Sequence, residues 1–228
     1  MTFNPRHSAT LTPLVKHMRP IESVLNVRVT NPSQTPLGTL RERTRELHAH
    51  LEAAININAA LNSIPTYVRL LCGYLNVYSS FEAALPYHDT CISEIVSQTY
   101  RSRVPSLQRD LRELGVDPND CRRTSADIPL PDLSTLDAVL GALYVVEGSN
   151  LGGQIIYREI QQQLMIDMNS GAAFFFGNGE QTGPAWKRFT ELLNKSIANP
   201  DQAADAAAAM FQTFEYGLQA QTEDGPVQ

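Results

Sequence analysis

ALYVVEGSNLGGQ, residues 142–154, sets three glycines inside a pattern that is helical on both sides, with apolar residues at helical spacing from 136 to 143 and from 155 to 164. Each glycine costs a helix about 1 kcal/mol relative to alanine, so the cluster needs a reason. One explanation is a bend or a close helix crossing. The other is a flat ligand lying against bare backbone, where a Cβ would collide. A phosphate-binding loop is disfavoured, because GSNLGG lacks the spacing of those motifs and follows a helix.

Helical periodicity extends in both directions from this stretch. Thr39 and Glu42 predict a capping box for a first helix whose apolar stripe runs to about Ser63. The remaining helices are expected between Pro65 and Pro86, from Ile92 to Gly115, from Ser134 or Thr135 to Leu164, from Pro184 to Leu193 and from Asp201 to Phe214. Only residues 21–29 resemble a strand. The sequence therefore predicts an all-α fold with one helical domain.

The two ends of the chain differ from this helical body. Residues 1–36 contain five prolines and little apolar periodicity, which predicts an extended or partly disordered N-terminal arm. Residues 37–220 form the expected helical domain, and residues 221–228 the expected flexible C-terminal tail.

Composition excludes several classes of protein. A net charge of -6 over 228 residues argues against a nucleic-acid binder that neutralises phosphates. No stretch approaches the roughly 18 apolar residues of a membrane span, and the first 20 residues lack the apolar run of a signal peptide. The three cysteines, Cys72, Cys91 and Cys121, are odd in number and widely spaced, which suits neither a disulfide framework nor a zinc site. We therefore expect a cytoplasmic globular protein.

The predicted first helix carries the candidate metal ligand. His48 lies between the leucines of the apolar stripe, whereas His50 points more toward the arginine-rich solvent face. Taken alone, such a histidine is more often part of a core than a ligand. The arginines of this helix also allow two interpretations. They can form a solvent-exposed face that pairs with neighbouring glutamates, or some of them, such as Arg41, can bind ligand carboxylates at the mouth of a pocket.

Together, these two segments resemble the heme oxygenase family, in particular its bacterial biliverdin-producing branch. The family's opening helix is similar to residues 40–52, LRERTRELHAHLE, and its glycine-kinked distal helix is similar to residues 142–154. The likeness runs from about Leu37 to Leu218 and includes Tyr78 with Glu82. Either motif alone is weak, but the pair in this order is specific. The resemblance implies a heme sandwiched between the proximal helix and the glycine-kinked helix.

The resemblance also assigns roles to individual residues. His48 matches the proximal iron ligand. Glu52 matches a carboxylate that orients that ligand, and Gly148 and Gly152 match the glycines over the distal heme face. The remaining matches are Arg41 and Lys187 as basic groups for the heme propionates, Tyr78 in the distal hydrogen-bond network, and Ser149 at the position where animal members carry an aspartate.

The reaction that the resemblance implies uses heme b as both cofactor and substrate. Oxygen and electrons from an external donor open the ring at a meso carbon to biliverdin, carbon monoxide and ferrous iron. The donor would be a ferredoxin or a flavoprotein reductase, drawn to arginines and lysines around the heme edge. No nucleic-acid or membrane partner is expected, and a monomer is the default.

Two alternatives keep the same fold. A heme-binding sensor or carrier without turnover would retain His48 and the glycines but lack the distal water network. Thiaminase-like or di-iron relatives would need inward carboxylates and Glu-x-x-His pairs, and the chain contains no Glu-x-x-His. A helical interaction protein would explain neither the glycines nor His48.

Overall fold

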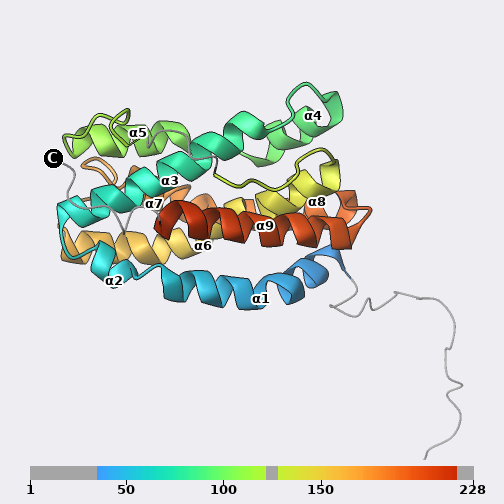
Figure 1. The fold of residues 1–228 in the computed structure, drawn as a ribbon, viewed down its shortest axis with the longest axis horizontal. Helices are drawn as coiled ribbons and strands as arrows, with labels where there is room; N and C mark the ends of the chain where they lie inside the picture. Colours follow the sequence, from blue (N-terminus) through green and yellow to red (C-terminus); the bar gives the residue numbers. More distant parts are fainter. Residues whose placement is uncertain (1–34, 122–127, 220–228) are drawn as a thin grey trace, which may run out of the picture.

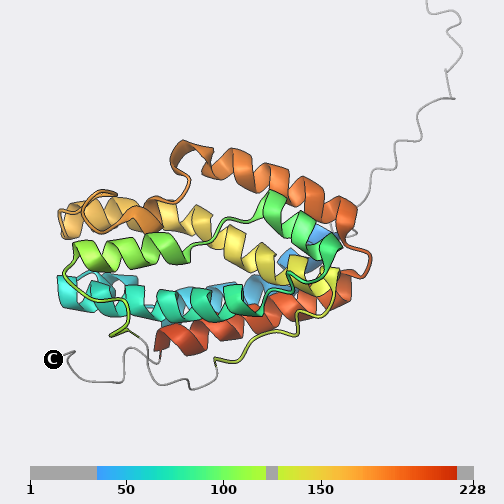
Figure 2. The ribbon, with the colours of Figure 1, turned by 90° about the horizontal axis from the view of Figure 1, so that it is seen from above.

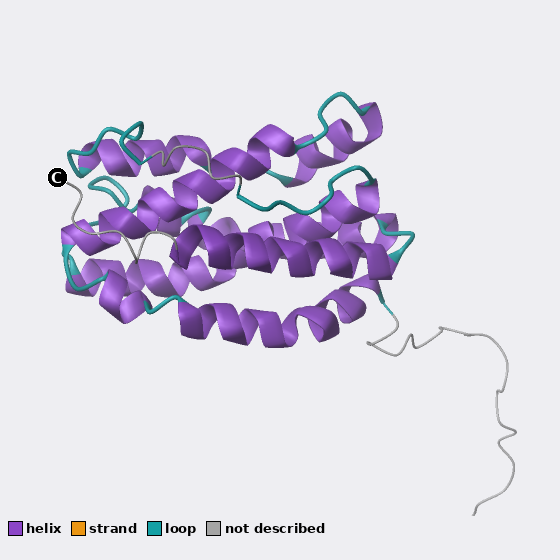
Figure 3. Ribbon diagram, in the orientation of Figure 1, coloured by secondary structure: helices purple, strands orange, loops and turns teal. Residues whose placement is uncertain are grey.

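The computed structural model describes residues 35–121 and 128–219, and every regular element within these ranges is helical (Figures 1 and 3). The elements are α1 (Pro36–Ala54), α2 (Ile57–Ala60), α3 (Ile64–Ala84), α4 (Thr90–Thr99), α5 (Val104–Glu113), α6 (Leu136–Gln163), α7 (Ala173–Phe176), the 3-10 turn η2 (Gly179–Gln181), α8 (Thr182–Ser196) and α9 (Pro200–Gln219). The all-α prediction is confirmed. The predicted strand at 21–29, nearly all of the arm and the tail lie outside the described residues. In the described ranges, no helix combines the length and apolarity that a membrane crossing requires.

Helix α9 lies between α1 and α3 in the view of Figure 1 and contacts α1, α3 and α6. Its close approach to α6 follows from small residues on both sides: four alanines of α9 between 203 and 207 are buried, and a Cβ on Gly141 of α6 would lie only 2.0 Å from the Ala203 carbonyl oxygen. Helix α6 runs unbroken through the glycine cluster and changes direction along its length (Figure 2). The glycines thus bend a helix without ending it.

Local capping signals locate most helix starts, but not the first. Helix α1 begins at Pro36 with Thr35 as N-cap, and the Thr35 hydroxyl accepts a hydrogen bond from Gly38 N at 3.1 Å. The predicted capping box of Thr39 and Glu42 is therefore wrong. The helix also ends at Ala54 rather than near residue 63, and α2 follows as a separate turn.

The expected caps of two later helical segments are confirmed. The Thr135 hydroxyl accepts from Ala138 N at the start of α6. Gly115 has φ +80°, the left-handed backbone of a C′ residue, just after α5.

Helix α1 packs a narrow stripe of leucines on the core, and charged side chains add further contacts with α9. Only two of its 19 residues are buried. Arg43 contacts Asp205 at 2.6 Å and Asp201 at 3.5 Å, and His50 Nε2 lies 3.0 Å from Glu215 Oε1. Arg43 and His50 thus reach acids of α9, instead of the neighbouring glutamates and the open solvent that the sequence suggested. Surface pairs of this kind each contribute about 0–1 kcal/mol.

A disulfide joins Cys72 of α3 to Cys121 in the segment after α5, with 5.0 Å between their Cα atoms. The Asn76 side chain adds a hydrogen bond to the Cys121 carbonyl at 3.0 Å. The expectation that the cysteines would not form a disulfide is wrong, because α5 packs along α3 and brings two distant positions together. Cys91 is the free, exposed thiol.

Removing this bridge is expected to destabilise the protein markedly. Cys72→Ala should lower the free energy of unfolding by about 4 kcal/mol in the chain-entropy estimate, because the bridge spans 49 residues and restricts the unfolded chain. Urea denaturation without reductant measures the effect, with Cys91→Ala as the matched control. Equal midpoints for Cys72→Ala and Cys91→Ala would contradict a stabilising bridge.

Candidate functional site

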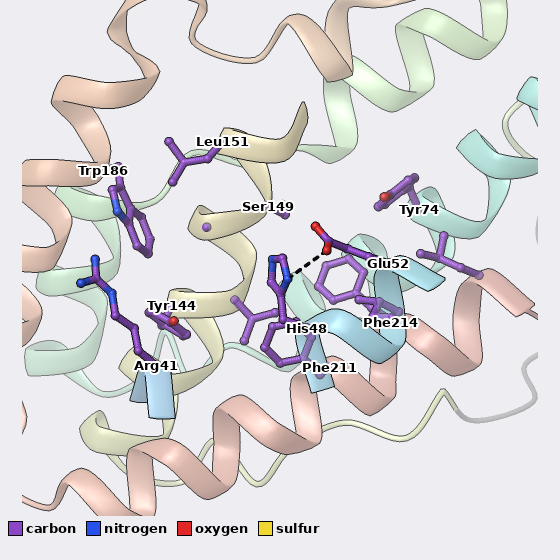
Figure 4. A pocket seen from close by; sticks show the side chains of 14 residues that line it. Arg41, His48, Glu52, Tyr74, Tyr144, Ser149, Leu151, Trp186, Phe211 and Phe214 are labelled. Carbon is purple, nitrogen blue, oxygen red and sulfur yellow. Dashed lines mark ion pairs between the residues drawn. The ribbon is translucent and has the colours of Figure 1, made fainter. Parts of the chain in front are cut away.

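A cavity of about 290 Å³ lies between α1 and α6 and is closed by side chains of α3, α8 and α9 (Figure 4). Its walls are largely aromatic, with Trp186 and Tyr144 near one end and Phe214 and Tyr74 near the other. Rings of this kind present wide apolar surface, which suits a flat, hydrophobic ligand.

Helix α1 brings three of the predicted residues to the cavity. Arg41, His48 and Glu52 are spaced at seven and four residues, so they share one helix face. The side chains of His48 and Glu52 are 60% and 71% exposed, and His48 Nδ1 lies 3.5 Å from Glu52 Oε2. The His48 ring also packs edge-on against Phe211, at 5.8 Å between centroids. With Nδ1 facing the carboxylate, the Nε2 atom is available to a metal ion in the cavity.

The glycines of α6 serve two purposes. Gly148 lines the cavity, and a Cβ there would lie 3.5 Å from the Trp186 ring. Gly152, one turn later, is exposed and is not among the residues that line the cavity, and a Cβ there would meet no protein atom within 4 Å. Gly153 instead permits close packing, since its Cβ would lie 3.4 Å from the Phe175 carbonyl oxygen. The cluster therefore supports both explanations considered for it, a close contact and a bare surface for a ligand.

The polar group on the α6 wall is the hydroxyl of Ser149. It donates to the Val146 carbonyl at 2.8 Å and lies 3.1 Å from the hydroxyl of Tyr78, which stands behind the wall. Burial raises the pKa of Tyr78 to about 12, so the phenol stays neutral at physiological pH. The pair can orient a hydrogen bond at the cavity surface but carries no charge.

A second polar cluster lies behind this wall and was missed in the sequence. Glu147 is 8% exposed, and burial raises the pKa of its carboxyl group to about 7, against the opposing influence of the Arg103 charge and of a hydrogen bond from Asn150. The signal was present, because Glu147 interrupts an apolar run just before Gly148. Its partner Arg103 lies 44 positions away, beyond the reach of a local pattern.

The remaining predicted residue, Lys187, is exposed on α8 and is not among the residues that line the cavity. Its neighbour Trp186 faces the cavity instead. Among the described lining residues, Arg41 is the single cation. Within residues 35–121 and 128–219, no three His, Cys, Asp or Glu side chains gather to hold a metal ion, which the di-iron alternative would require.

Residues 36–220 match the family model described as heme oxygenase. The chain is also 34% identical over 160 residues to the heme oxygenase of Xanthomonas campestris pv. campestris, an alignment that covers 68% of this chain and 90% of that protein.

Solved structures show the same fold at lower identity. The NO- and CO-bound heme oxygenase of Neisseria meningitidis is 20% identical, with a TM-score of 0.70 over 86% of this chain and 97% of the other. Heme oxygenase 2 of Chlamydomonas reinhardtii, solved without heme, is 19% identical, with a TM-score of 0.71 over 86% of this chain and all of the other.

Proposed function

Because the chain belongs to the heme oxygenase family and is a heme-degrading oxidoreductase, we propose that it opens heme b at a meso carbon and releases biliverdin, carbon monoxide and ferrous iron. The observation that carries the proposal is the pairing of an accessible imidazole, His48, with the bare backbone of Gly148 on the facing helix. A planar macrocycle with a central metal needs a ligand atom such as an imidazole nitrogen on one side and room on the other.

Different residues of the cavity would bind different parts of such a ligand. His48 would bind the iron through Nε2, and Glu52 would fix the orientation of the ring through Nδ1. Arg41 would bind a propionate at the end of the cavity near Trp186, because a guanidinium pairs well with a carboxylate (Figure 4). Lys187, on the surface of α8, is the second basic group proposed for a propionate.

Bound heme supplies both the iron centre at which oxygen is reduced and the ring that is oxidised. The protein's contribution is placement and polarity. The aromatic side chains would surround the ring with apolar surface, the Gly148 backbone leaves the α6 side open, and the Ser149 oxygen, which contacts Tyr78, is the polar atom on that side. A single neutral polar group on this wall fixes an orientation without a strong acid nearby.

Electrons would come from a ferredoxin or a flavoprotein reductase, and we propose that the enzyme acts as a monomer. A cytoplasmic location belongs to the same proposal, because reduced donors of this kind are maintained there. The Cys72–Cys121 bridge would then form only under oxidising conditions. Thiol counting on protein isolated with rapid alkylation tests this point.

The proposal is tested by titrating the purified protein with hemin and then adding reduced ferredoxin or ascorbate in air. A one-to-one Soret band that decays into the broad red absorption of biliverdin is expected. A Soret band that persists with both reductants would favour a heme carrier or sensor. No Soret band would overturn the proposal.

Gly148→Val is expected to weaken hemin binding more than tenfold while leaving the apoprotein folded. Gly148 lines the cavity, so the new side chain would enter the space that the proposed ligand occupies, and its Cβ would make only an ordinary contact with the Trp186 ring at 3.5 Å. Hemin titration and thermal unfolding measure the two effects. Gly183→Val is the matched control, because Gly183 is also helical but lies outside the cavity lining. Equal hemin affinity for the two variants would argue against a ligand at this helix face.

A further inference from the structure

We propose that Glu147 stores a proton behind the α6 wall and delivers it to the cavity through Tyr78 and Ser149. Glu147 would thus act on the heme reaction as a positioning residue, through other groups. The inference rests on the proposed function, because reduction of oxygen in the cavity consumes protons. In each delivery, the Glu147 carboxyl group loses one proton, one proton appears on water at the cavity surface, and the carboxylate regains a proton from solvent.

The cavity itself holds no acid on the side where the proton is needed. Among the described lining residues, Glu52 is the only carboxylate, and it contacts the His48 ring on the opposite helix. On the α6 wall, the Ser149 hydroxyl donates to the Val146 carbonyl and accepts from Tyr78. Tyr78 can pass a proton to Ser149, and Ser149 can pass one to the cavity once its hydroxyl turns away from the Val146 carbonyl, but neither group stores a proton near neutral pH.

Glu147 meets the requirement for storage. Its carboxyl group is buried immediately before Gly148, on the side of α6 away from the cavity lining, and Asn150 Nδ2 lies 3.3 Å from its Oε2. Its raised pKa of about 7 means that it exchanges a proton in the physiological range. A buried carboxyl group that served only packing would be better replaced by an apolar side chain of similar size.

Arg103 links Glu147 to Tyr78 electrostatically. Its Nη2 donates to the Phe174 carbonyl at 2.9 Å, and a Cβ on Gly177 would lie 3.3 Å from Nη2 and 3.8 Å from Asn150 Oδ1. The Gly177 position therefore borders both the guanidinium and the side chain of Asn150, whose amide bonds Glu147. Beyond the dominant influence of burial, the Arg103 charge lowers the pKa of the Tyr78 hydroxyl and the Glu147 charge raises it.

Arg103 also points to water within the cluster. Its Nε is buried and bonds no atom of the described residues. Buried donors of this kind are normally satisfied by internal water, which bridges polar groups and carries protons between them. A water at Nε would extend the chain of Tyr78 and Ser149 toward Glu147.

The outer side of the cluster reaches solvent through Glu82 of α3. This half-buried carboxylate accepts from the Tyr100 hydroxyl at 2.7 Å, the Arg103 backbone N–H at 2.8 Å and the exposed Ser102 hydroxyl at 2.5 Å. The pKa of Tyr100 is raised by burial first and then by its acidic and phenolic neighbours, so it stays neutral. Asp110 of α5 accepts from two backbone amides of α7 and is therefore already committed to holding that helix.

The first test needs no heme. Because the folded-state pKa of Glu147 lies above the ordinary value near 4.5, the folded protein binds the proton more tightly, and stability is lost as pH rises from about 5 through 7. Glu147→Gln removes that loss, so its thermal midpoint should exceed wild type at pH 8 and match it at pH 5. Glu159→Gln, an acid of the same helix with no such environment, is the control. Identical pH dependence for wild type and Glu147→Gln would overturn the proposal.

The second test follows hemin degradation from pH 5.5 to 9. Wild type should slow as pH rises through about 7, because the stored proton is then lost. Glu147→Gln should be at least about tenfold slower at pH 6, with this break abolished, and Glu147→Asp should restore the break. Tyr78→Phe combined with Glu147→Gln should cost no more than the larger single loss, since both interrupt one path.

The outcomes separate this proposal from the proposed function. Failure of wild type to bind or degrade hemin would overturn the proposed function, and this inference with it. Normal degradation with the same pH profile in Glu147→Gln and wild type would overturn the role of Glu147 alone. A loss of activity in Glu147→Gln that is equal at every pH would indicate structure rather than proton supply, and would also overturn it.

Discussion

His48→Ala is expected to abolish hemin degradation and to lower hemin affinity by at least about tenfold, because it removes the one imidazole that lines the cavity. The ring packs edge-on against Phe211 but is mostly exposed, so the variant should fold normally. Absorbance titration with hemin shows the effect as loss of the ligand-dependent Soret position, and added imidazole should restore part of the spectrum.

His50→Ala is the matched control for this prediction. His50 lies two positions further along α1 and contacts Glu215 of α9 rather than the cavity. Its replacement should leave the spectrum and turnover of the hemin complex unchanged. An unaltered spectrum in His48→Ala would remove His48 as the ligand, whatever the result for His50→Ala.

Gly141→Ala is expected to destabilise the apoprotein more than any other single methyl group added to α6. The new Cβ would lie 2.0 Å from the Ala203 carbonyl oxygen and 2.9 Å from its Cα, and these are backbone atoms that cannot rotate aside. Helices α6 and α9 would have to separate, at a cost of about 3 kcal/mol or more. For a chain of this size, such a loss lowers the thermal midpoint by roughly 10 °C.

Gly183→Ala controls for the change in backbone freedom. A Cβ there meets nothing within 4 Å, so alanine should stabilise α8 by about 0.5–1 kcal/mol through its higher helix propensity. Urea denaturation of both variants gives the comparison. A Gly141→Ala protein as stable as wild type would show that α6 and α9 can repack, contrary to their close approach.

The helix boundaries that depend on adjacent residues in the chain could be predicted from the sequence. Thr135 and Gly115 bracket helical segments as predicted, because caps depend on a few adjacent residues. The prediction failed at the start of α1, where Thr35 and Pro36 form a better cap than Thr39. Both sites have suitable residue types, so residue type alone does not choose between them.

The features of the cavity also differ in whether they depend on neighbours in the chain or on tertiary packing. Arg41, His48 and Glu52 were predicted from the resemblance to the heme oxygenase family, and their spacing on one helix explains why all three reach the cavity. The pairing of Cys72 with Cys121 was not, because it depends on how α3 and α5 pack. The proximity of Arg103 to Glu147 has the same origin: a tertiary contact leaves no periodic signature in the sequence.

Helix α1, with two buried residues and charged ties to α9, has one further consequence. A ligand that spans from α1 to α6 would add apolar contact to the partly buried leucines of α1, so folding and ligand binding would be thermodynamically linked. At a free concentration one hundred times Kd, such linkage is worth about 2.7 kcal/mol. Destroying the ligand withdraws that contribution, so turnover itself would loosen the helix that holds the product.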